Sequence, residues 1–350
     1  MKDTHTVVFD IGGTWFRSGM YTAGTGLTNQ SKTPAYNYKN TPHDSITQLQ
    51  LKLVDYLTKQ VRSFRSTRID IKGASISMGA ALDDRTGEIL NSGPLWGPNC
   101  EPFDLLGYLR KRMPEVDWLI INDVSAALLR HVNDSEYRKA RRVNLITVSS
   151  GIACRTYDQK GQYIPLNADG IQGEIGHIPI HFSLFGEFIT ETCDCGGANH
   201  LNAFVSGRGI TKILLRLSAF GTSSIKDSEL LNRLQGLSEM ELNKTFFSML
   251  NASNPDALKI LDEVTFPIAE MIIRTLTIDA EVEKIIMTGG VVHAAEKHYI
   301  ESLLRNLEKI GLYQVPSPAT FFRKTVTLGV DDDNSGLLGA AIAYENRMPK

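Results

Sequence analysis

The same arrangement of residues occurs once in each half of this chain: an apolar strand, a bend of small residues and a second strand. In the first half it is TVVFDIGGTWFRSGMY, residues 6–21, where a glycine pair separates two runs of β-branched and aromatic residues. In the second half it is VNLITVSSGIACRTYD, residues 143–158. Helical patterns at residues 44–64 and 293–310 alternate with further apolar strands. We therefore expect an α/β fold built as two related lobes with a cleft between them.

The chain is longer than one ordinary hydrophobic core fills, because its 350 residues exceed the size at which single cores usually stop growing. We place the first lobe at residues 1–121 and the second at residues 122–333. The segment 334–350 opens with NSGLLGAAIAYENR, a run of small residues that predicts a helix able to pack closely against a neighbour. We expect this helix to cross back and complete the first lobe.

Composition argues against several classes of protein. The formal net charge is −2 and charged residues make up 22% of the chain, so the charge balance favours neither nucleic acid nor an anionic membrane as a partner. Apolar runs are too short for a transmembrane helix, and the first residues lack the apolar core of a secretory signal. The 4 cysteines do not make a disulfide framework. These features predict a protein of the reducing cytoplasm.

Three bends combine glycine with small polar side chains at strand ends. The first, DIGGT at residues 10–14, lets the backbone approach an anion closely, and its threonine adds a hydroxyl donor. The second is SSG at residues 149–151, and the third is TGG at residues 288–290, which ends a strand before a helix. One such turn is often only a hairpin, but three in this order predict a nucleotide phosphate site. Its candidate residues are Asp10, Gly12, Gly13, Thr14, Ser150, Gly151, Gly289 and Gly290.

Asn122 and Asp123 follow the apolar strand DWLII at residues 117–121 and precede a helical pattern. Ligand sites of open α/β sheets lie beyond the carboxyl ends of such strands. Asp123 is therefore a candidate general base, able to take the proton of a substrate hydroxyl as that hydroxyl attacks a phosphoryl group. The local pattern fits equally well an aspartate that caps the following helix, and the two roles are compatible.

The segment EIGHIPIHFSLFGEFITETCDCGGANH, residues 174–200, contains a cluster of metal-ligating side chains. Zinc favours four nitrogen and sulfur ligands in a tetrahedron, and a closed set of four predicts a structural ion. His181 is a competing ligand that we rank lower, because it lies close to the first histidine in a predicted strand. The alternative is a pair of buried thiols beside unrelated histidines. The candidate ligands are His177, Cys193, Cys195 and His200.

A structural ion in this segment would hold the loop that carries Glu174 and His177. These two side chains are therefore candidates to line a substrate pocket, with Glu174 accepting hydrogen bonds from hydroxyl groups. We expect the metal centre to support a binding site rather than to take part in the chemistry.

Five motifs, in this order along the chain, resemble the ROK family (repressor, open reading frame, kinase). The resemblance implies a two-lobed, actin-like or ribonuclease H-like ATPase fold with an interlobe cleft. It also implies ATP-dependent phosphorylation of a sugar or sugar-like alcohol by a homodimer, with Mg²⁺ beside the phosphates. Because DIGGT begins at residue 10, no helix-turn-helix of the repressor branch fits before it, which favours the enzyme branch. The motifs are DIGGT at 10–14, IND at 121–123, GEIGH at 173–177, CDCG at 193–196 and TGG at 288–290.

The resemblance also implies roles for single residues. By position, Asp123 matches the family's catalytic base, and Asn122 matches its neighbour that contacts the substrate. Glu174 and His177 match ligands of sugar hydroxyls. The first two bends match the phosphate loops, and the TGG bend matches the adenosine region.

Several positions depart from the family's pattern. His200 stands where the family usually has a third cysteine, and Asn202 where it usually has a glutamate that binds the sugar. The second phosphate loop reads SSGIA at residues 149–153 in place of G-T-G-x-G. In the first lobe MGAAL at residues 78–82 replaces a loop with P-G, which leaves Gly79 as the candidate substrate contact there.

These departures argue against a routine glucokinase. A carboxylate accepts hydrogen bonds from two hydroxyls, whereas the amide of Asn202 both donates and accepts, so we expect an acceptor with a carbonyl or without that hydroxyl pair. A kinase for C7 cyclitols of the valiolone type, acting in aminocyclitol biosynthesis, fits such a pocket. A second alternative is a non-catalytic sugar sensor of the same fold, which the altered second phosphate loop supports.

Overall fold

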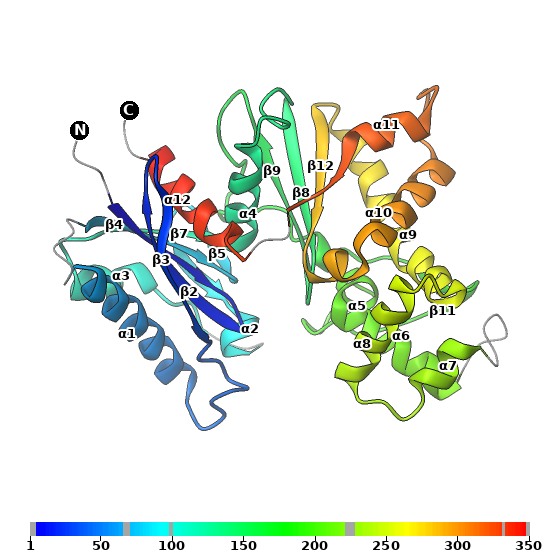
Figure 1. Cartoon of the computed structure of the whole chain (residues 1–350), viewed down its shortest axis with the longest axis horizontal. Helices are drawn as coiled ribbons and strands as arrows, with labels where there is room; N and C mark the ends of the chain where they lie inside the picture. Colours follow the sequence, from blue (N-terminus) through cyan, green and yellow to red (C-terminus); the bar gives the residue numbers. More distant parts are fainter. Residues whose placement is uncertain (1–4, 66–70, 98–100, 221–227, 331–332, 348–350) are drawn as a thin grey trace. The chain divides into compact units, whose positions relative to one another are not determined.

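The computed structural model describes residues 5–65, 71–97, 101–220, 228–330 and 333–347. The chain divides into two compact α/β units (Figure 1), which confirms the predicted fold class. Unit 1 comprises Met1–Arg138, Tyr163–Gln172 and Asp332–Lys350, and unit 2 comprises Lys139–Gln162 and Gly173–Asp331.

The main sheet of unit 1 has the strand order β3-β2-β1-β4-β7. Its first three strands form an antiparallel meander, whereas β4 and β7 run parallel to β1. The middle of β1, Val7–Phe9, is a continuous apolar run because both faces of the sheet are covered: Phe9 and Ile11 belong to one core, and Val8 packs with Leu337 in another. The strands are β1 (His5–Ile11), β2 (Trp15–Thr22), β3 (Gly26–Pro34), β4 (Ile71–Met78) and β7 (Asp117–Asn122), with a separate hairpin of β5 (Ala81–Asp83) and β6 (Glu88–Asn91).

Those helices of unit 1 that the sequence predicts begin close to the expected positions. The helix expected at residues 44–64 is α1, and Ser45 caps it: its hydroxyl accepts from the Gln48 N–H at 3.2 Å, while the Gln48 side chain accepts from the Ser45 N–H at 2.7 Å. The helices are α1 (Ile46–Arg65), α2 (Gly93–Trp96), α3 (Leu105–Arg112), α4 (Asp123–Val132) and α12 (Ser335–Arg347).

The C-terminal helix α12 packs against α4 and the main sheet of unit 1. The approach is so close that a Cβ on Gly339 would lie 1.9 Å from the carbonyl oxygen of Ala126. This contact keeps α4 within unit 1, whose first segment runs to Arg138, whereas the predicted boundary lies after residue 121.

The main sheet of unit 2 has the order β13-β12-β8-β9, with β8 and β9 antiparallel and the other pairs parallel. The second strand-bend-strand unit of the sequence is therefore β8 and β9, as β1 and β2 are the first. The strands are β8 (Arg142–Val148), β9 (Ile152–Asp158), β12 (Val282–Thr288) and β13 (Val326–Leu328), with a hairpin of β10 (Phe182–Leu184) and β11 (Glu187–Ile189).

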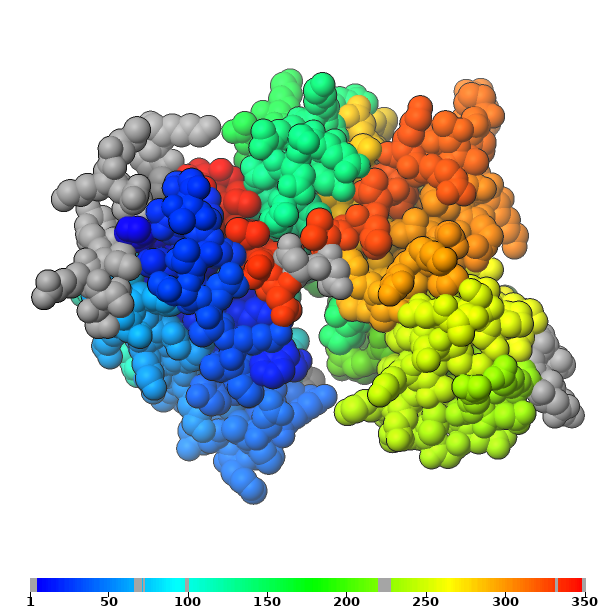
Figure 2. Space-filling model, in the orientation of Figure 1, coloured from blue at the N-terminus to red at the C-terminus, as the bar shows by residue number. Residues whose placement is uncertain are grey.

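One large core holds the helices of unit 2 on its sheet, and it includes the fully buried Val148, Phe204, Ile268 and Leu303. Helices α7 and α8 form part of the surface of this unit (Figure 2). Among the described residues, no helix is long and apolar enough to cross a lipid bilayer. The helices are η1 (Ile175–His177), α5 (Asn202–Val205), α6 (Gly207–Phe220), α7 (Glu229–Leu234), α8 (Glu239–Asn251), α9 (Pro255–Ile278), α10 (Gly290–Ile310) and α11 (Pro318–Thr325).

Candidate active site and metal centre

The bend between β1 and β2 carries Gly12, Gly13 and Thr14, and other parts of unit 1 fix its shape. The side chain of Asn37 donates from Nδ2 to the Gly13 carbonyl oxygen at 2.7 Å. A Cβ on Gly13 would lie 2.6 Å from Cβ of Pro94 at the start of α2, so no other residue fits there without a shift. Thr14 stays exposed beside these contacts, and its hydroxyl is available to a ligand.

Asp10 lies at the end of β1, immediately before this bend. Its carboxylate pairs with Arg17 at 3.1 Å and accepts a longer hydrogen bond from the Ser77 hydroxyl at 3.4 Å. Arg17 also pairs with Asp333 at 2.7 Å. Burial raises the pKa of Asp10, and the Arg17 charge opposes that rise. The guanidinium therefore favours the charged form of an otherwise desolvated carboxylate at the base of the bend.

Asn122 and Asp123 lie where β7 passes into α4. Asn122 is the N-cap of the helix: its Oδ1 accepts from the Val124 and Ser125 N–H groups at 2.9 and 3.3 Å. Its Nδ2 donates to the Ala80 carbonyl oxygen at 2.9 Å, and only 5% of the residue is exposed. Asn122 thus fixes the turn that presents Asp123, and its expected contact with substrate stays a prediction.

Asp123 is the first residue of α4, so its carboxylate lies in the favourable field of the helix N-terminus. Its Oδ1 accepts from the Val124 N–H at 2.9 Å. The backbone of Gly79 passes close by, since a Cβ at that position would lie 3.2 Å from Oδ2 of Asp123. The structure therefore brings the candidate base and Gly79 together within unit 1, and the capping role falls to Asn122.

Asp84 contributes to this arrangement, although the sequence gives no signal for it. Its Oδ1 accepts from the Asn122 backbone N–H at 3.1 Å, and its Oδ2 accepts from the Ser125 hydroxyl at 3.3 Å. The carboxylate lies in a turn next to β5, 38 residues before Asn122. It braces the junction on which the orientation of Asp123 depends.

The bend between β8 and β9, residues 149–151, holds Ser150 and Gly151. It closes on itself through a hydrogen bond from the Ser149 N–H to the Gly151 carbonyl oxygen at 2.8 Å. Gly289, at the end of β12, passes so close that a Cβ there would lie 2.5 Å from the Val148 carbonyl oxygen, and its φ is 103°. Glycine is required at residue 289 on both counts, and the structure brings the second and third predicted bends together within unit 2.

Asn202 lies beside the second bend. Its Oδ1 accepts from the Ile152 N–H at 2.7 Å. In the described part of the chain no contact is recorded for its Nδ2, so the amide can still donate to a ligand. An amide can accept one hydrogen bond through its oxygen and donate another through its nitrogen, whereas a carboxylate at the same position can only accept.

Glu174 follows Gly173 in a segment that runs against β9. The Cys154 N–H donates to the Gly173 carbonyl oxygen at 2.7 Å, and Gly173 has a φ of 66° that favours glycine. Oε1 of Glu174 pairs with Arg155 at 3.1 Å, and 4% of the arginine side chain is exposed. The ion pair with this buried guanidinium fixes the orientation of the Glu174 carboxylate, whose oxygens can accept hydrogen bonds from hydroxyl groups.

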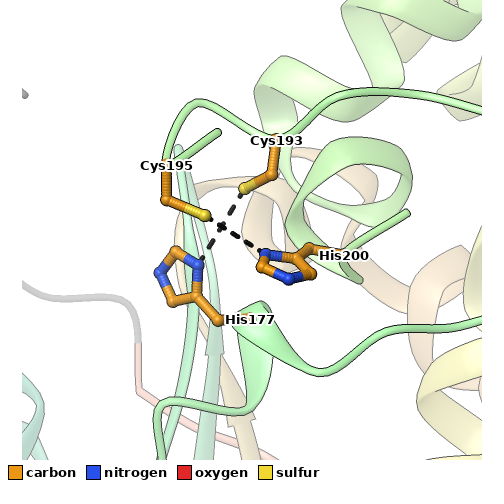
Figure 3. Close-up of side chains that lie close together, drawn as sticks. All are labelled: His177, Cys193, Cys195 and His200. Carbon is orange, nitrogen blue, oxygen red and sulfur yellow. Dashed lines mark hydrogen bonds between the residues drawn. The ribbon is translucent and has the colours of Figure 1, made fainter. Parts of the chain in front are cut away.

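Four side chains of unit 2 converge on one point (Figure 3). Their ligand atoms all lie within 4.8 Å of one another, with 3.9 Å from Sγ of Cys193 to Nδ1 of His177 and 3.2 Å from Sγ of Cys195 to Nδ1 of His200. A tetrahedral zinc site with its usual bond lengths needs sulfur–nitrogen separations of about 3.5 Å, so the set fits. The structure thus brings the four predicted ligands together, and the group does not include His181.

The close turn after Cys195 explains the glycines of this segment. A Cβ on Gly197 would lie 2.1 Å from the ring of His200, and Gly196 has a φ of 87°. Cys195 and His200 can therefore approach each other because neither Gly196 nor Gly197 places a side chain in the turn. Two thiolates and two imidazoles would fill all four positions of a tetrahedral ion. No position would be left for water or substrate, as expected of a structural ion.

Comparisons with known proteins agree with these features. The model of the ROK family matches residues 6–347. A 2-epi-5-epi-valiolone 7-kinase of Actinoplanes sp. is 35% identical over 306 residues, 87% of this chain and 83% of that protein. A C(7)-cyclitol 7-kinase of Streptomyces hygroscopicus subsp. jinggangensis is 27% identical and covers 95% of this chain and 92% of its own. The ROK hexokinase of Thermus thermophilus shares the fold, with a TM-score of 0.69, 20% identity, and coverage of 98% of this chain and 99% of that chain.

Proposed function

Since the chain belongs to the ROK family, we propose that it is an ATP-dependent kinase that phosphorylates a hydroxyl group of a sugar-like C7 cyclitol. The observation that carries the choice of acceptor is the 35% identity to a 2-epi-5-epi-valiolone 7-kinase over most of both chains. Asn202, in place of the glutamate expected of sugar kinases in this family, supports the same choice. The alternative is that the acceptor is a hexose.

The mechanism assigns the proton transfer to Asp123. Its carboxylate takes the proton of the acceptor hydroxyl as the oxygen attacks the γ-phosphoryl group in line. The amides and hydroxyls of the first two bends, Thr14 and Ser150 among them, bind and orient the phosphates. Gly289 and Gly290 let the nucleotide lie against the end of β12. Mg²⁺, when bound together with ATP, would supply the positive charge that neutralises the phosphates.

We propose that Glu174, His177 and Asn202 bind the acceptor. Asn122 and Gly79 stay separate candidates for contacts with the acceptor. The ion pair with Arg155 orients the Glu174 carboxylate, which can accept hydrogen bonds from the hydroxyl groups of the substrate. The amide nitrogen of Asn202 adds a donor, which suits a ketone or ether oxygen of the acceptor. Residue 202 is therefore not expected to bind a pair of sugar hydroxyls as the family's usual glutamate does.

For the metal centre we propose a structural zinc ion, because soft thiolates with imidazoles in a tetrahedral set favour zinc among the common divalent ions. Its ligands would be His177, Cys193, Cys195 and His200. We further propose that the protein works in the cytoplasm, where ATP is abundant and thiols stay reduced, and that it is a homodimer. Light scattering on the purified protein tests the last point.

An acceptor screen tests the proposed function. ATP consumption is measured over a panel of C7 cyclitols and hexoses, and NMR locates the phosphate on each product. We expect the highest kcat/KM with a C7 cyclitol. A hexose that outperforms every cyclitol would overturn the choice of acceptor. The altered loop at residues 149–153 favours one other function, a sensor, and binding without any turnover across the panel would establish it.

A further inference from the structure

One short segment, residues 202–208, holds the whole second bend. As described above, Asn202 accepts from the Ile152 N–H. The Gly207 N–H donates to the Ser149 carbonyl oxygen at 2.7 Å, and Nε of Arg208 donates to the Ser150 carbonyl oxygen at 2.9 Å. Three hydrogen bonds from one segment therefore fix three of the four residues from 149 to 152.

The same segment is attached to the metal centre. Asn202 lies two residues after the ligand His200. A Cβ on Gly176, the neighbour of the ligand His177, would lie 2.4 Å from Oδ1 of Asn202. On the other side Nη1 of Arg208 pairs at 2.6 Å with Asp194, the residue between the two cysteine ligands. Arg208 thus connects the Cys-x-Cys loop directly to the Ser150 carbonyl.

The ion pair between Arg208 and Asp194 contributes little as a source of stability. The side chains are 59% and 54% exposed, and ion pairs this exposed add little to the stability of a fold. What the pair provides is orientation, because the planar guanidinium bonds two different segments at once through Nε and Nη1. A shift of the Cys-x-Cys loop would therefore move the donor that holds Ser150.

We propose that Arg208 and Asn202 are positioning residues that make the geometry of the second bend depend on occupancy of the metal centre. Loss of the ion frees the Cys-x-Cys loop and His200, and with them both attachments of the 202–208 segment. The inference rests on the proposed function only for the identity of the ligand that the bend binds, the phosphates of ATP. Metal loss would accordingly weaken nucleotide binding and also loosen the loop that carries Glu174 and His177.

Hydrogen exchange measured by mass spectrometry tests the coupling without any assumption about activity. The samples are the zinc-loaded protein, the protein stripped with a chelator, Arg208→Ala and Arg233→Ala. The last is a matched control, because Arg233 and Glu229 form a pair of similar exposure, 61% and 62%, in the same unit. Metal content is determined for every sample by elemental analysis.

We expect stripping to speed exchange of the Ile152 and Gly207 amides by about tenfold or more, with the amides of β12 unchanged. Arg208→Ala, still holding about one zinc ion per chain, should give part of this increase, and Arg233→Ala none. Unchanged exchange at Ile152 and Gly207 in stripped protein, while the 193–200 peptide exchanges faster, would overturn the proposal.

Steady-state kinetics supply the second readout. Arg208→Ala should raise KM for ATP by about five- to tenfold and change KM for the acceptor by less than about twofold. Arg208→Lys keeps a charge for Asp194 but has no fork to bond both segments, so we expect an intermediate value. Asn202→Asp keeps an acceptor for the Ile152 N–H and should retain more nucleotide affinity than Asn202→Ala.

Two outcomes separate the inference from the proposed function. An equal rise in both KM values of Arg208→Ala would show a general structural role and contradict the coupling. A wild-type protein that binds no ATP, yet shows the metal-dependent exchange at Ile152 and Gly207, would remove the proposed function and leave the coupling intact.

Discussion

The first bend, Gly12–Thr14, and the second, Ser149–Gly151, join the same kind of antiparallel strand pair but are held in different ways. Asn37 and Pro94, both in unit 1, fix the first. The second is held by the segment that follows His200 and by Arg208, which pairs with the Cys-x-Cys loop. Two similar loops of one fold are thus held by different supports, packing and a side-chain amide in one case and a segment next to the cluster of candidate metal ligands in the other.

Asp123→Asn should have the largest effect and should leave both bends untouched. The amide has the size of the carboxylate but cannot accept the proton, so we expect kcat to fall by about 10⁴-fold or more. Nucleotide affinity and zinc content should stay at the wild-type level, as measured by calorimetry and elemental analysis. Asp134→Asn, in the partly buried Arg130–Asp134 pair at the end of the same helix, serves as the control. Near-normal turnover of Asp123→Asn would remove the assigned base.

Cys195→Ser should affect the second bend and spare the first. We expect loss of the bound zinc and destabilisation by about 2–5 kcal/mol, because binding of a structural zinc ion is coupled to folding. Differential scanning calorimetry with elemental analysis measures both. His181→Asn, a histidine of the same segment outside the four-residue group, should leave both unchanged. Unaltered stability in a metal-free Cys195→Ser protein would contradict a structural centre.

Gly13→Ala should affect the first bend and spare the second. Its new Cβ would lie 2.6 Å from Pro94, so we expect a loss of about 1–3 kcal/mol in the free energy of unfolding. Gly12→Ala is the matched control, because a Cβ there would meet its nearest atom at an ordinary 3.5 Å. Urea unfolding distinguishes the two, and zinc content should be normal in both. Equal stability of the two variants would mean that α2 does not constrain this bend.

Acid should also act on the bends differently, because Asp10 precedes the first and Thr147 occupies the equivalent place before the second. The raised pKa of Asp10 means that the folded state binds its proton more tightly than the unfolded state. Its contribution to stability is therefore complete below the ordinary value of 3.8 and is lost as the pH rises through the raised pKa. Relative to Asp10→Asn, the wild-type protein should lose stability across that window in urea titrations. A constant difference would exclude a raised pKa.

The sequence predicts those features that depend on local pattern. The two strand-bend-strand units follow from hydrophobic alternation, and the metal group follows from the spacing of Cys193, Cys195 and His200. Local pattern left open whether Asp123 caps α4, and the structure gives that role to Asn122. The roles of Asp123 in transfer and of Glu174 in acceptor binding remain predictions.

The supports of the site have no such local signal. Asn37 bonds a carbonyl 24 residues away, Asp84 an amide 38 residues away, and Arg208 a carbonyl 58 residues away. Each is a common polar residue in an ordinary loop or helix end, and its partner becomes a neighbour only when the sheet has formed. Such residues are found from the fold, because their effect depends on distance in space rather than on spacing along the chain.

The packing of α12 against α4 has a consequence for protein synthesis. Since α12 follows the whole of unit 2 in the sequence, it is synthesised after that unit, although the sheet it covers is made first. Until α12 has been synthesised, it cannot cover Val8 and the face of α4 around Ala126, so these surfaces stay exposed to other chains or to chaperones. A chain that ends before residue 335 would therefore lack the helix that packs on α4, the helix that begins with Asp123.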